Sequence, residues 1–215
     1  MAISPPPARP GEPDVAFAAP ASADVFDRTV SNLRARGFDV RVAADLAEAR
    51  ALVRDLIPPG AEVQVGPSVT LEDSGIRADI EDSGRYDAVR PRTRRMDRAT
   101  QAREIRRLAM APDWSIGSVH AVTETGSFVT ASASGSQLAT YASGAARVVW
   151  VIGAQKIVPD LAAAFDRIER YAFPREDARS WQAYGEPSAI NQLLIVNGEE
   201  VPRITAILVR EAVGF

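Results

Sequence analysis

The chain of 215 residues contains no cysteine, one histidine and one lysine. Without cysteine, this sequence cannot supply disulfides, thiolate nucleophiles, iron-sulfur ligands or cysteine-type zinc sites. Carboxylates are then the remaining metal ligands, and no paired acidic motif points to a metal, so we expect neither metal nor cofactor. A net charge of -3 argues against general nucleic-acid binding. No apolar run approaches the roughly 20 residues that cross a bilayer, so we expect a cytoplasmic protein without a membrane partner.

The beginning of the chain differs in composition from the rest. Residues 1–23 hold six of the fifteen prolines and many alanines, and they lack the basic start and apolar core of a signal peptide. We therefore interpret residues 1–23 as a flexible tail and residues 24–215 as a single domain.

The first half of this domain alternates between helical and strand patterns. A helix capped at Ser22 or Asp24 should end near Gly37, and a second helix should begin after Asp45. Short apolar strands are expected over 38–42 and 63–65, and a glycine loop follows the second strand. This order predicts an α/β fold with an open, mostly parallel sheet flanked by helices.

The second half continues with two helices, two hairpins and one buried strand. The predicted helices cover 93–111 and 159–169, and the apolar run 148–152 indicates a strand buried on both faces. One hairpin should pair 119–123 with 128–131, and a C-terminal hairpin should pair 193–196 with 204–209. The pattern of apolar residues is less regular over 171–190, and we interpret this segment as a connection between the preceding helix and the C-terminal strands.

Three polar loops follow predicted strands, at 66–70, 126–137 and 153–156. In open α/β sheets, ligands bind at the carboxyl ends of strands, so these loops should share one edge. Ordinary helix capping is the alternative for Ser68 and Ser136, and a solvated surface side chain is the alternative for the single lysine. The predicted ligand-binding residues, which would hold a small anion, are Gly66, Ser68, Thr70, Thr123, Thr125, Gly126, Ser127, Ser136, Gln137 and Lys156.

Two further residues in this region carry groups suited to catalysis. Glu124 stands at a strand end before a Thr-Gly-Ser turn, where it could act as a general base or nucleophile or remain solvated. We name it as the candidate catalytic residue. His120 lies between Ser118 and Glu124, but strand spacing does not stack these residues for proton relay, so a structural, hydrogen-bonded histidine is preferred.

Arginine is dense between Arg90 and Arg107. On a helix these positions spread around the polar circumference, as expected for a solvated face. A docking surface for an acidic protein or RNA is the alternative, and the scarcity of aromatic residues weakens the RNA alternative.

Four segments together carry a family resemblance. They are Gly66-Pro-Ser-Val-Thr-Leu71, His120-Ala-Val-Thr-Glu-Thr-Gly-Ser127, Gly153-Ala-Gln-Lys-Ile-Val-Pro-Asp160 and the closing segment 203–215. In these segments the sequence resembles the LUD domain, the lactate-utilisation protein family. The resemblance implies a fold similar to the CoA-transferase and sugar-phosphate isomerase group, and a link to L-lactate oxidation alongside iron-sulfur oxidoreductase subunits. It implies no particular catalytic residue.

Three functional hypotheses follow. The first is a protein that binds a small anion and supports 2-hydroxyacid utilisation, with iron-sulfur subunits or a second copy of the chain as candidate partners. The second is a stand-alone enzyme for acyl or phosphoryl transfer that uses Glu124. The third is a non-catalytic assembly or regulatory protein that acts through the Arg90–Arg107 face.

Overall fold

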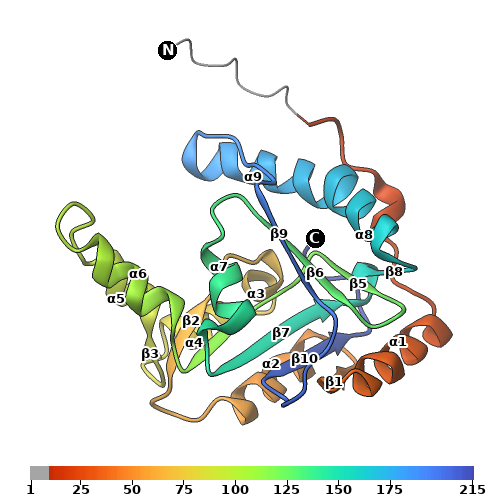
Figure 1. Ribbon diagram of the computed structural model, residues 1–215, viewed down its shortest axis with the longest axis horizontal. Helices are drawn as coiled ribbons and strands as arrows, with labels where there is room; N and C mark the ends of the chain where they lie inside the picture. The colour runs from red at the N-terminus through yellow and green to blue at the C-terminus, as the bar shows by residue number, and fades with distance from the viewer. Residues whose placement is uncertain (1–9) are drawn as a thin grey trace.

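The computed structural model describes residues 10–215, and its centre is a six-stranded sheet in which all strands run parallel (Figure 1). The strand order is β1-β10-β7-β4-β2-β3. This confirms the α/β class and the parallel sheet. The bounds are β1 (Asp39–Ala43), β2 (Glu62–Val65), β3 (Asp87–Ala88), β4 (Trp114–Gly117), β7 (Arg147–Gly153) and β10 (Ile204–Val209).

A second, four-stranded sheet lies against one face of the first, with the order β8-β5-β6-β9. Its strands are β5 (Ala121–Thr123), β6 (Phe128–Ser132), β8 (Ile157–Val158) and β9 (Gln192–Val196). Strands β5 and β6 pair antiparallel, which confirms the first predicted hairpin. The second sheet therefore arises from connections between strands of the first sheet.

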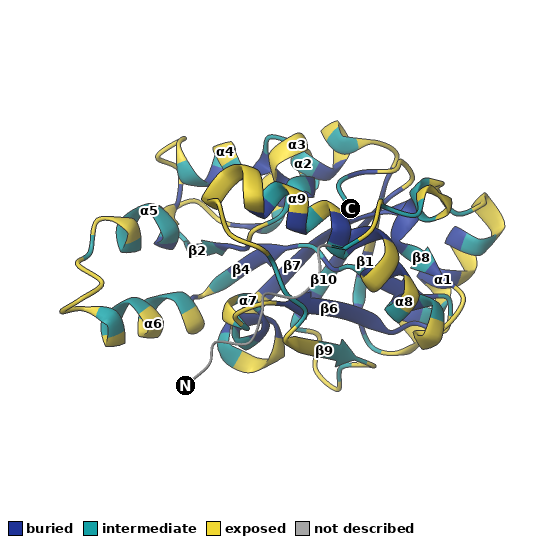
Figure 2. Ribbon diagram, turned by 90° about the horizontal axis from the view of Figure 1, so that it is seen from above, coloured by how far each residue is buried: buried dark blue, intermediate teal, exposed yellow. Residues whose placement is uncertain are grey.

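Alternate side chains of β7 divide the core into two layers. Trp150 packs against Phe128 of the second sheet, in a cluster that also contains Phe26 of α1 (Ala23–Ala35). Val149 and Val151 belong to the cluster on the opposite face. That opposite face is covered by α2, α3 and α4, and in Figure 2 the buried strands lie between exposed helices. The helices are α1 (Ala23–Ala35), α2 (Leu46–Leu56), α3 (Val69–Asp73), α4 (Ile76–Glu81), α5 (Val89–Arg94), α6 (Ala102–Met110), α7 (Ser136–Ala139), α8 (Leu161–Arg167) and α9 (Phe173–Tyr184).

The predicted helix over 93–111 is confirmed only where α6 lies, and its earlier part is wrong, because a turn separates α6 from α5. Asp97 explains the interruption. Its carboxylate accepts hydrogen bonds from the Ala99 amide (2.9 Å) and the Thr100 hydroxyl (2.7 Å). Such local side-chain bonds compete with the helical backbone pattern. The two helices extend away from the rest of the molecule (Figure 1).

The interpretation of 171–190 as a connection was also wrong over most of its length. Helix α8 continues through a π-helical segment, η4 (Ile168–Ala172), into α9, which ends at Gly185. Gly185 adopts φ 72°, the left-handed conformation typical of a residue that ends a helix. The sequence pattern missed this helix because few of its positions are buried and no regular apolar stripe marks it.

Both expected C-terminal strands exist, but they do not pair with each other as a hairpin. Strand β9 pairs antiparallel with β6, whereas β10 lies in the first sheet between β1 and β7. Burial explains the separation: β10 is almost entirely buried, as a central strand must be, and β9 is half exposed, as an edge strand can be. The loop between them is held at α1, where the Glu199 amide donates to the Arg36 carbonyl over 3.0 Å.

Residues 10–22, expected to belong to the tail, contact the domain. They include a 3-10 helix, η1 (Val15–Ala18), and the Asp14 amide donates to the Arg170 carbonyl over 2.8 Å. Asp14 also forms an ion pair with the Arg170 side chain. Residues 1–9 of the expected tail lie outside the described residues. Between residues 10 and 215, no helix is both long enough and apolar enough to cross a membrane.

Candidate functional site

A cavity of about 290 Å³ lies at the carboxyl ends of β2, β4 and β7. This is the edge at which open α/β sheets usually bind ligands, and the volume is at the small end for a ligand site. Its lining combines the loop after β2, the β4–β5 connection, the segment after β6, a 3-10 helix after β7 named η3 (Ala154–Lys156), and α9. A small ligand is therefore the appropriate occupant.

Lys156 lines this cavity and is 1% exposed. Its Nζ donates hydrogen bonds to Thr70 Oγ1 (3.2 Å) and Ser118 Oγ (3.0 Å). Burial lowers the pKa of Lys156 well below its usual value, and the positive charge of Arg167 lowers it further. Asp73 opposes these effects only in part. These surroundings therefore favour the neutral amine more than water does, when the cavity holds no anion.

His120 also lines the cavity, and its Nδ1 accepts a hydrogen bond from the Ala131 amide over 3.1 Å. Burial lowers the pKa of His120 to about 3, with contributions from the charges of Lys156 and Arg167. The imidazole is therefore neutral near pH 7. Because Nδ1 accepts from an amide, the single ring proton belongs on Nε2, which leaves a donor for a ligand.

Arg167 lies directly behind these two residues and is fully buried. Its guanidinium donates to the His120 carbonyl and, over 3.2 Å, to the Gln155 carbonyl, so it ties the β4–β5 connection to η3. Nη2 has no hydrogen-bond partner, and among residues 10–215 no carboxylate forms an ion pair with Arg167. Burial lowers the pKa of Arg167 to about 10, so it stays charged at pH 7. A buried positive charge without a counter-ion therefore lies behind the cavity lining, next to the backbone of His120.

Hydroxyl groups supply much of the remaining polar lining. Ser68 precedes α3 but makes no side-chain capping bond, so its hydroxyl is not used by the helix. Across the cavity, Gln137 Oε1 accepts from Ser132 Oγ (3.0 Å) and Ser136 Oγ (3.3 Å). Such hydroxyls can donate to an oxygen-rich ligand after small rotations.

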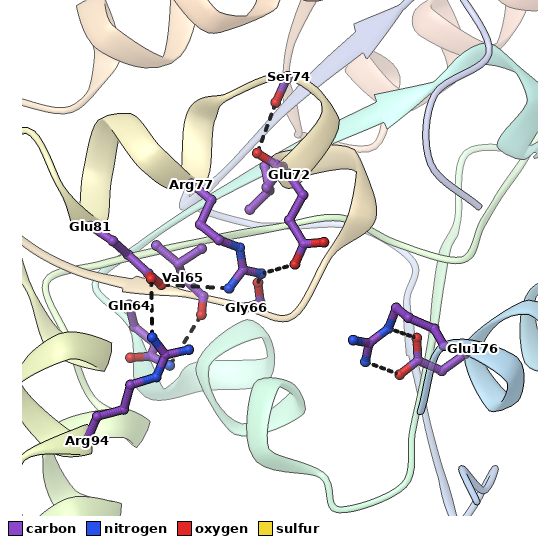
Figure 3. Close-up of polar contacts among 11 residues, drawn as sticks. Gln64, Val65, Gly66, Glu72, Ser74, Arg77, Glu81, Arg94 and Glu176 are labelled. Atoms are coloured by element: carbon purple, nitrogen blue, oxygen red, sulfur yellow. Dashed lines mark hydrogen bonds and ion pairs between the residues drawn. The ribbon is translucent and has the colours of Figure 1, made fainter. Parts of the chain in front are cut away.

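Helix α9 forms a wall that sequence reasoning did not predict. Glu176 accepts two hydrogen bonds of 2.7 Å from Arg179, and Figure 3 shows this bidentate pair apart from the Arg77 cluster. On the other side, Arg77 contacts Glu72 (3.3 Å) and donates to the Gly66 carbonyl (3.1 Å). Glu72 and Glu176 are the carboxylate side chains that line the cavity, and each is paired with an arginine other than Arg167.

Gly66 and Gly117 make room for the Tyr141 hydroxyl beneath the cavity. A Cβ at Gly117 would lie 1.7 Å from this oxygen, and a Cβ at Gly66 would lie 2.9 Å from it. The Gly66 amide donates to the Ile116 carbonyl over 2.8 Å, so it is not offered to a ligand. The role of Gly66 is therefore to permit close packing.

All three predicted loops contribute to the cavity, but the second does so only through its later residues, from Ala131 to Gln137. The turn directly after β5 lies elsewhere. The Glu124 carboxylate pairs with Arg28 of α1 at 2.6 Å, and its carbonyl accepts from Asn32 over 2.7 Å. The Thr125 carbonyl accepts from Arg36, and a Cβ at Gly126 would lie 2.9 Å from the same side chain. This turn fastens the second sheet to α1.

Thr123 and Ser127 belong to the same turn and have partners within it or beside it. Thr123 Oγ1 accepts from the Ser127 amide over 2.9 Å and lies 3.0 Å from the Thr125 hydroxyl. Ser127 Oγ donates to Asn197 over 2.8 Å. The predicted residues therefore divide into a cavity group, made of Ser68, Ser136, Gln137 and Lys156 with Thr70 as a partner of Lys156, and a turn group at Glu124.

Several cavity residues were not predicted. Ser118 enters the sequence argument only through its spacing from His120, and Glu176 and Arg179 belong to no motif. Arg167, which lies behind the cavity lining, belongs to no motif either. Arg167 lies seven residues, or two helical turns, after Asp160, which caps α8. The sequence pattern could therefore have placed Arg167 on this helix. It could not have shown that this part of the helix lies beside the cavity. Among residues 10–215 no group of three or more His, Asp or Glu side chains is placed to hold a metal ion.

The model of the LUD domain matches residues 26–208, which is most of the sequence. The chain belongs to the LUD domain family. A similar solved structure is the crystal structure of a duf162 family protein from Deinococcus radiodurans, with a TM-score of 0.51 and 14% sequence identity. The match covers 88% of this chain and 99% of that one, and at this identity it supports the fold alone. No curated protein matches this sequence.

Proposed function

We propose that this LUD domain protein binds a small carboxylate and supports the utilisation of a 2-hydroxyacid such as L-lactate. The observation that carries this proposal is the buried, uncompensated charge of Arg167 behind a cavity lined by Lys156 and hydroxyl groups. Arg167 has two carbonyl partners and lies over the Tyr171 ring, but it has no counter-ion among the described residues. A buried charge without a counter-ion is unfavourable, and an anion in the adjacent cavity would offset that cost.

The size and chemistry of the cavity favour a small ligand with several oxygen atoms. Ser68, Ser136 and the Nε2 proton of His120 can donate to carboxylate or hydroxyl oxygens. A carboxylate beside Lys156 would also favour the ammonium form of that lysine, so that anion binding is coupled to proton uptake. A volume of about 290 Å³ suits a small acid better than a nucleotide or a folate.

The iron-sulfur partner subunits remain part of this proposal through the family resemblance. Oxidation of a 2-hydroxyacid removes two electrons, and this sequence holds no cysteine thiolate with which to bind a cluster that would accept them. A separate electron-accepting subunit would supply that function. Co-purification with iron-sulfur subunits encoded beside this protein would test the partnership.

Isothermal titration calorimetry with L-lactate, pyruvate and phosphate tests the binding proposal. We expect the carboxylates to bind, and Lys156→Met to weaken L-lactate binding roughly tenfold or more, because a hydrogen bond to a charged group contributes about 1.5–3 kcal/mol. Repeating the titration in buffers of different ionisation enthalpy should reveal the proton uptake. Absence of any carboxylate binding by the folded protein would refute the proposal.

A further inference from the structure

When the Lys156 amine is neutral, its hydrogen bonds to two hydroxyl groups leave its lone pair free. Both hydroxyl groups that it contacts already use their protons elsewhere: Ser118 donates to the Val151 carbonyl over 2.7 Å, and Thr70 donates to the Val213 carbonyl over 3.4 Å. The short bond from Ser118 makes its oxygen an acceptor for Nζ, and the Thr70 oxygen can accept in the same way when its proton points to Val213. A neutral amine has two N–H groups and one lone pair, so the two hydroxyl groups occupy both protons and neither occupies the lone pair.

The surroundings of the amine disfavour its protonation in the empty cavity. Lys156 is almost completely buried, and none of the ion pairs among the described residues involves it. The facing charged groups are Arg167, which lowers its pKa, and Asp73, which raises it, with burial as the larger effect. A buried lysine of this kind, next to another cation, is the usual form of an amine that acts as a nucleophile at neutral pH.

We propose that Lys156 forms an imine with the carbonyl group of a small 2-oxo acid bound in the cavity. This inference rests on the proposed carboxylate site, and it adds a covalent step at a named atom. After any proton taken up with the carboxylate has returned to solvent, the lone pair of Nζ attacks the ketone carbon, so that a C–N bond forms and the carbonyl electrons move to oxygen. The carbinolamine then loses that oxygen as water. Both amine protons leave with the water, no electrons are exchanged, and no co-reactant is required.

Neighbouring residues fit the needs of this reaction. Ser118 and Thr70 fix the direction of Nζ, because each accepts one of its protons. The neutral His120 lines the same cavity and can donate its Nε2 proton as a hydrogen bond to the oxygen anion that develops. A 2-hydroxyacid has no carbonyl carbon to attack apart from its carboxylate, so it would bind without forming the bond.

The chain is well suited to a direct test, because Lys156 is its only lysine. The folded protein is incubated with pyruvate at neutral pH and treated with borohydride, which reduces an imine to a stable amine. We expect one adduct on the peptide that contains Lys156, with an added mass equal to that of pyruvate less one oxygen atom. Excess L-lactate should suppress labelling, and the urea-unfolded chain, in which Lys156 regains an ordinary pKa, should label far less.

The outcomes separate this inference from the proposed function. If calorimetry shows carboxylate binding but the Lys156 peptide stays unmodified, the imine is overturned and the binding site stands. If neither binding nor labelling occurs, both proposals fail. Labelling of the N-terminal amine alone, or equal labelling of Lys156 in the folded and unfolded chains, would also overturn the imine. Lys156→Met should abolish the internal adduct, and the wild-type comparison decides the question if that variant does not fold.

Discussion

The Lys156 amine donates a hydrogen bond to the Thr70 hydroxyl over 3.2 Å, and this contact joins η3, which follows β7, to the first turn of α3. Burying an amine removes it from water, which costs most when the amine is charged. The amine at position 156 therefore has opposite effects on the stability of the fold and on ligand binding. A nonpolar residue at position 156 should be more favourable for folding and less favourable for binding.

We predict that Lys156→Met stabilises the protein relative to wild type near pH 7 and that this advantage disappears toward pH 10. The pKa of Lys156 is lowered in the folded state, so between its folded and unfolded values the unfolded chain binds more protons and wild-type stability rises with pH. The slope contributed by one lysine is at most about 1.4 kcal/mol per pH unit. Urea unfolding of both proteins from pH 6 to about 10 measures the difference.

A constant difference between the two proteins across this range would contradict a lowered pKa for Lys156. Loss of the two hydrogen bonds to Thr70 and Ser118 offsets part of the gain at every pH. The diagnostic quantity is therefore the change in the difference with pH and not its absolute value.

His120 should make the wild-type protein lose stability as the pH falls below about 6.5. Its pKa is lowered to about 3 in the folded state, so the unfolded chain takes up the proton first, and stability is lost progressively between these two values. The expected loss is about 1.4 kcal/mol per pH unit within this window. His120→Asn, whose side-chain oxygen can still accept from the Ala131 amide, should remove this part of the acid sensitivity in urea unfolding experiments.

If His120→Asn and wild type lose stability in parallel between pH 6 and pH 4, the imidazole is not held neutral by burial. Other carboxylates titrate in the lower part of this window, so the comparison between the two proteins is essential. Because His120→Asn keeps all of these carboxylates, subtracting its free energy of unfolding from that of wild type cancels their contribution.

Much of the fold could be predicted from the sequence, because helix caps and apolar periodicity are local properties. Ser22 and Asp45 accept hydrogen bonds from the starts of α1 and α2, as their positions predicted. The C-terminal hairpin was wrong because adjacency in sequence favoured pairing β9 with β10. Ile204–Val209 instead fills the centre of a parallel sheet, a long-range arrangement that local pattern does not reveal.

The candidate site could be predicted only in part, for the same reason. Ser68 and Lys156 follow strands of the parallel sheet, whose carboxyl ends necessarily share one edge. Glu124 also follows a strand, but that strand belongs to the second sheet, and the turn points to α1. Arg179 lies on a helix that the pattern did not show. The sequence thus predicted which loops end strands, but not which sheet each strand joins.

Gly117→Ala should destabilise the protein by roughly 1–3 kcal/mol or more through overpacking. Its Cβ would lie 1.7 Å from the Tyr141 hydroxyl oxygen, which is buried and cannot move freely. Adding Tyr141→Phe should recover part of the loss by removing that oxygen, although the ring carbon behind it would still lie 2.8 Å away. Gly11→Ala is the matched control, because nothing lies within 4 Å of its added Cβ. Equal stability of Gly117→Ala and the control would contradict this packing.

The last prediction concerns Glu124, which sequence reasoning selected as the candidate catalytic residue. The structure pairs its carboxylate with Arg28, and these side chains are 25% and 54% exposed. Exposed ion pairs contribute little, so Glu124→Gln should change the free energy of unfolding by less than about 1 kcal/mol. Because the pair lies outside the cavity lined by Lys156, the same variant should bind L-lactate with wild-type affinity in calorimetry.

The matched comparison is between Glu124→Gln and Lys156→Met in one titration series. If the carboxylate site is the cavity, only the lysine variant should lose affinity, and Arg28→Gln should resemble Glu124→Gln in binding and in stability. If Glu124→Gln instead loses affinity while Lys156→Met retains it, the ligand binds at the turn beside α1. The two sites share no side chain, so the outcome assigns the ligand to one of them.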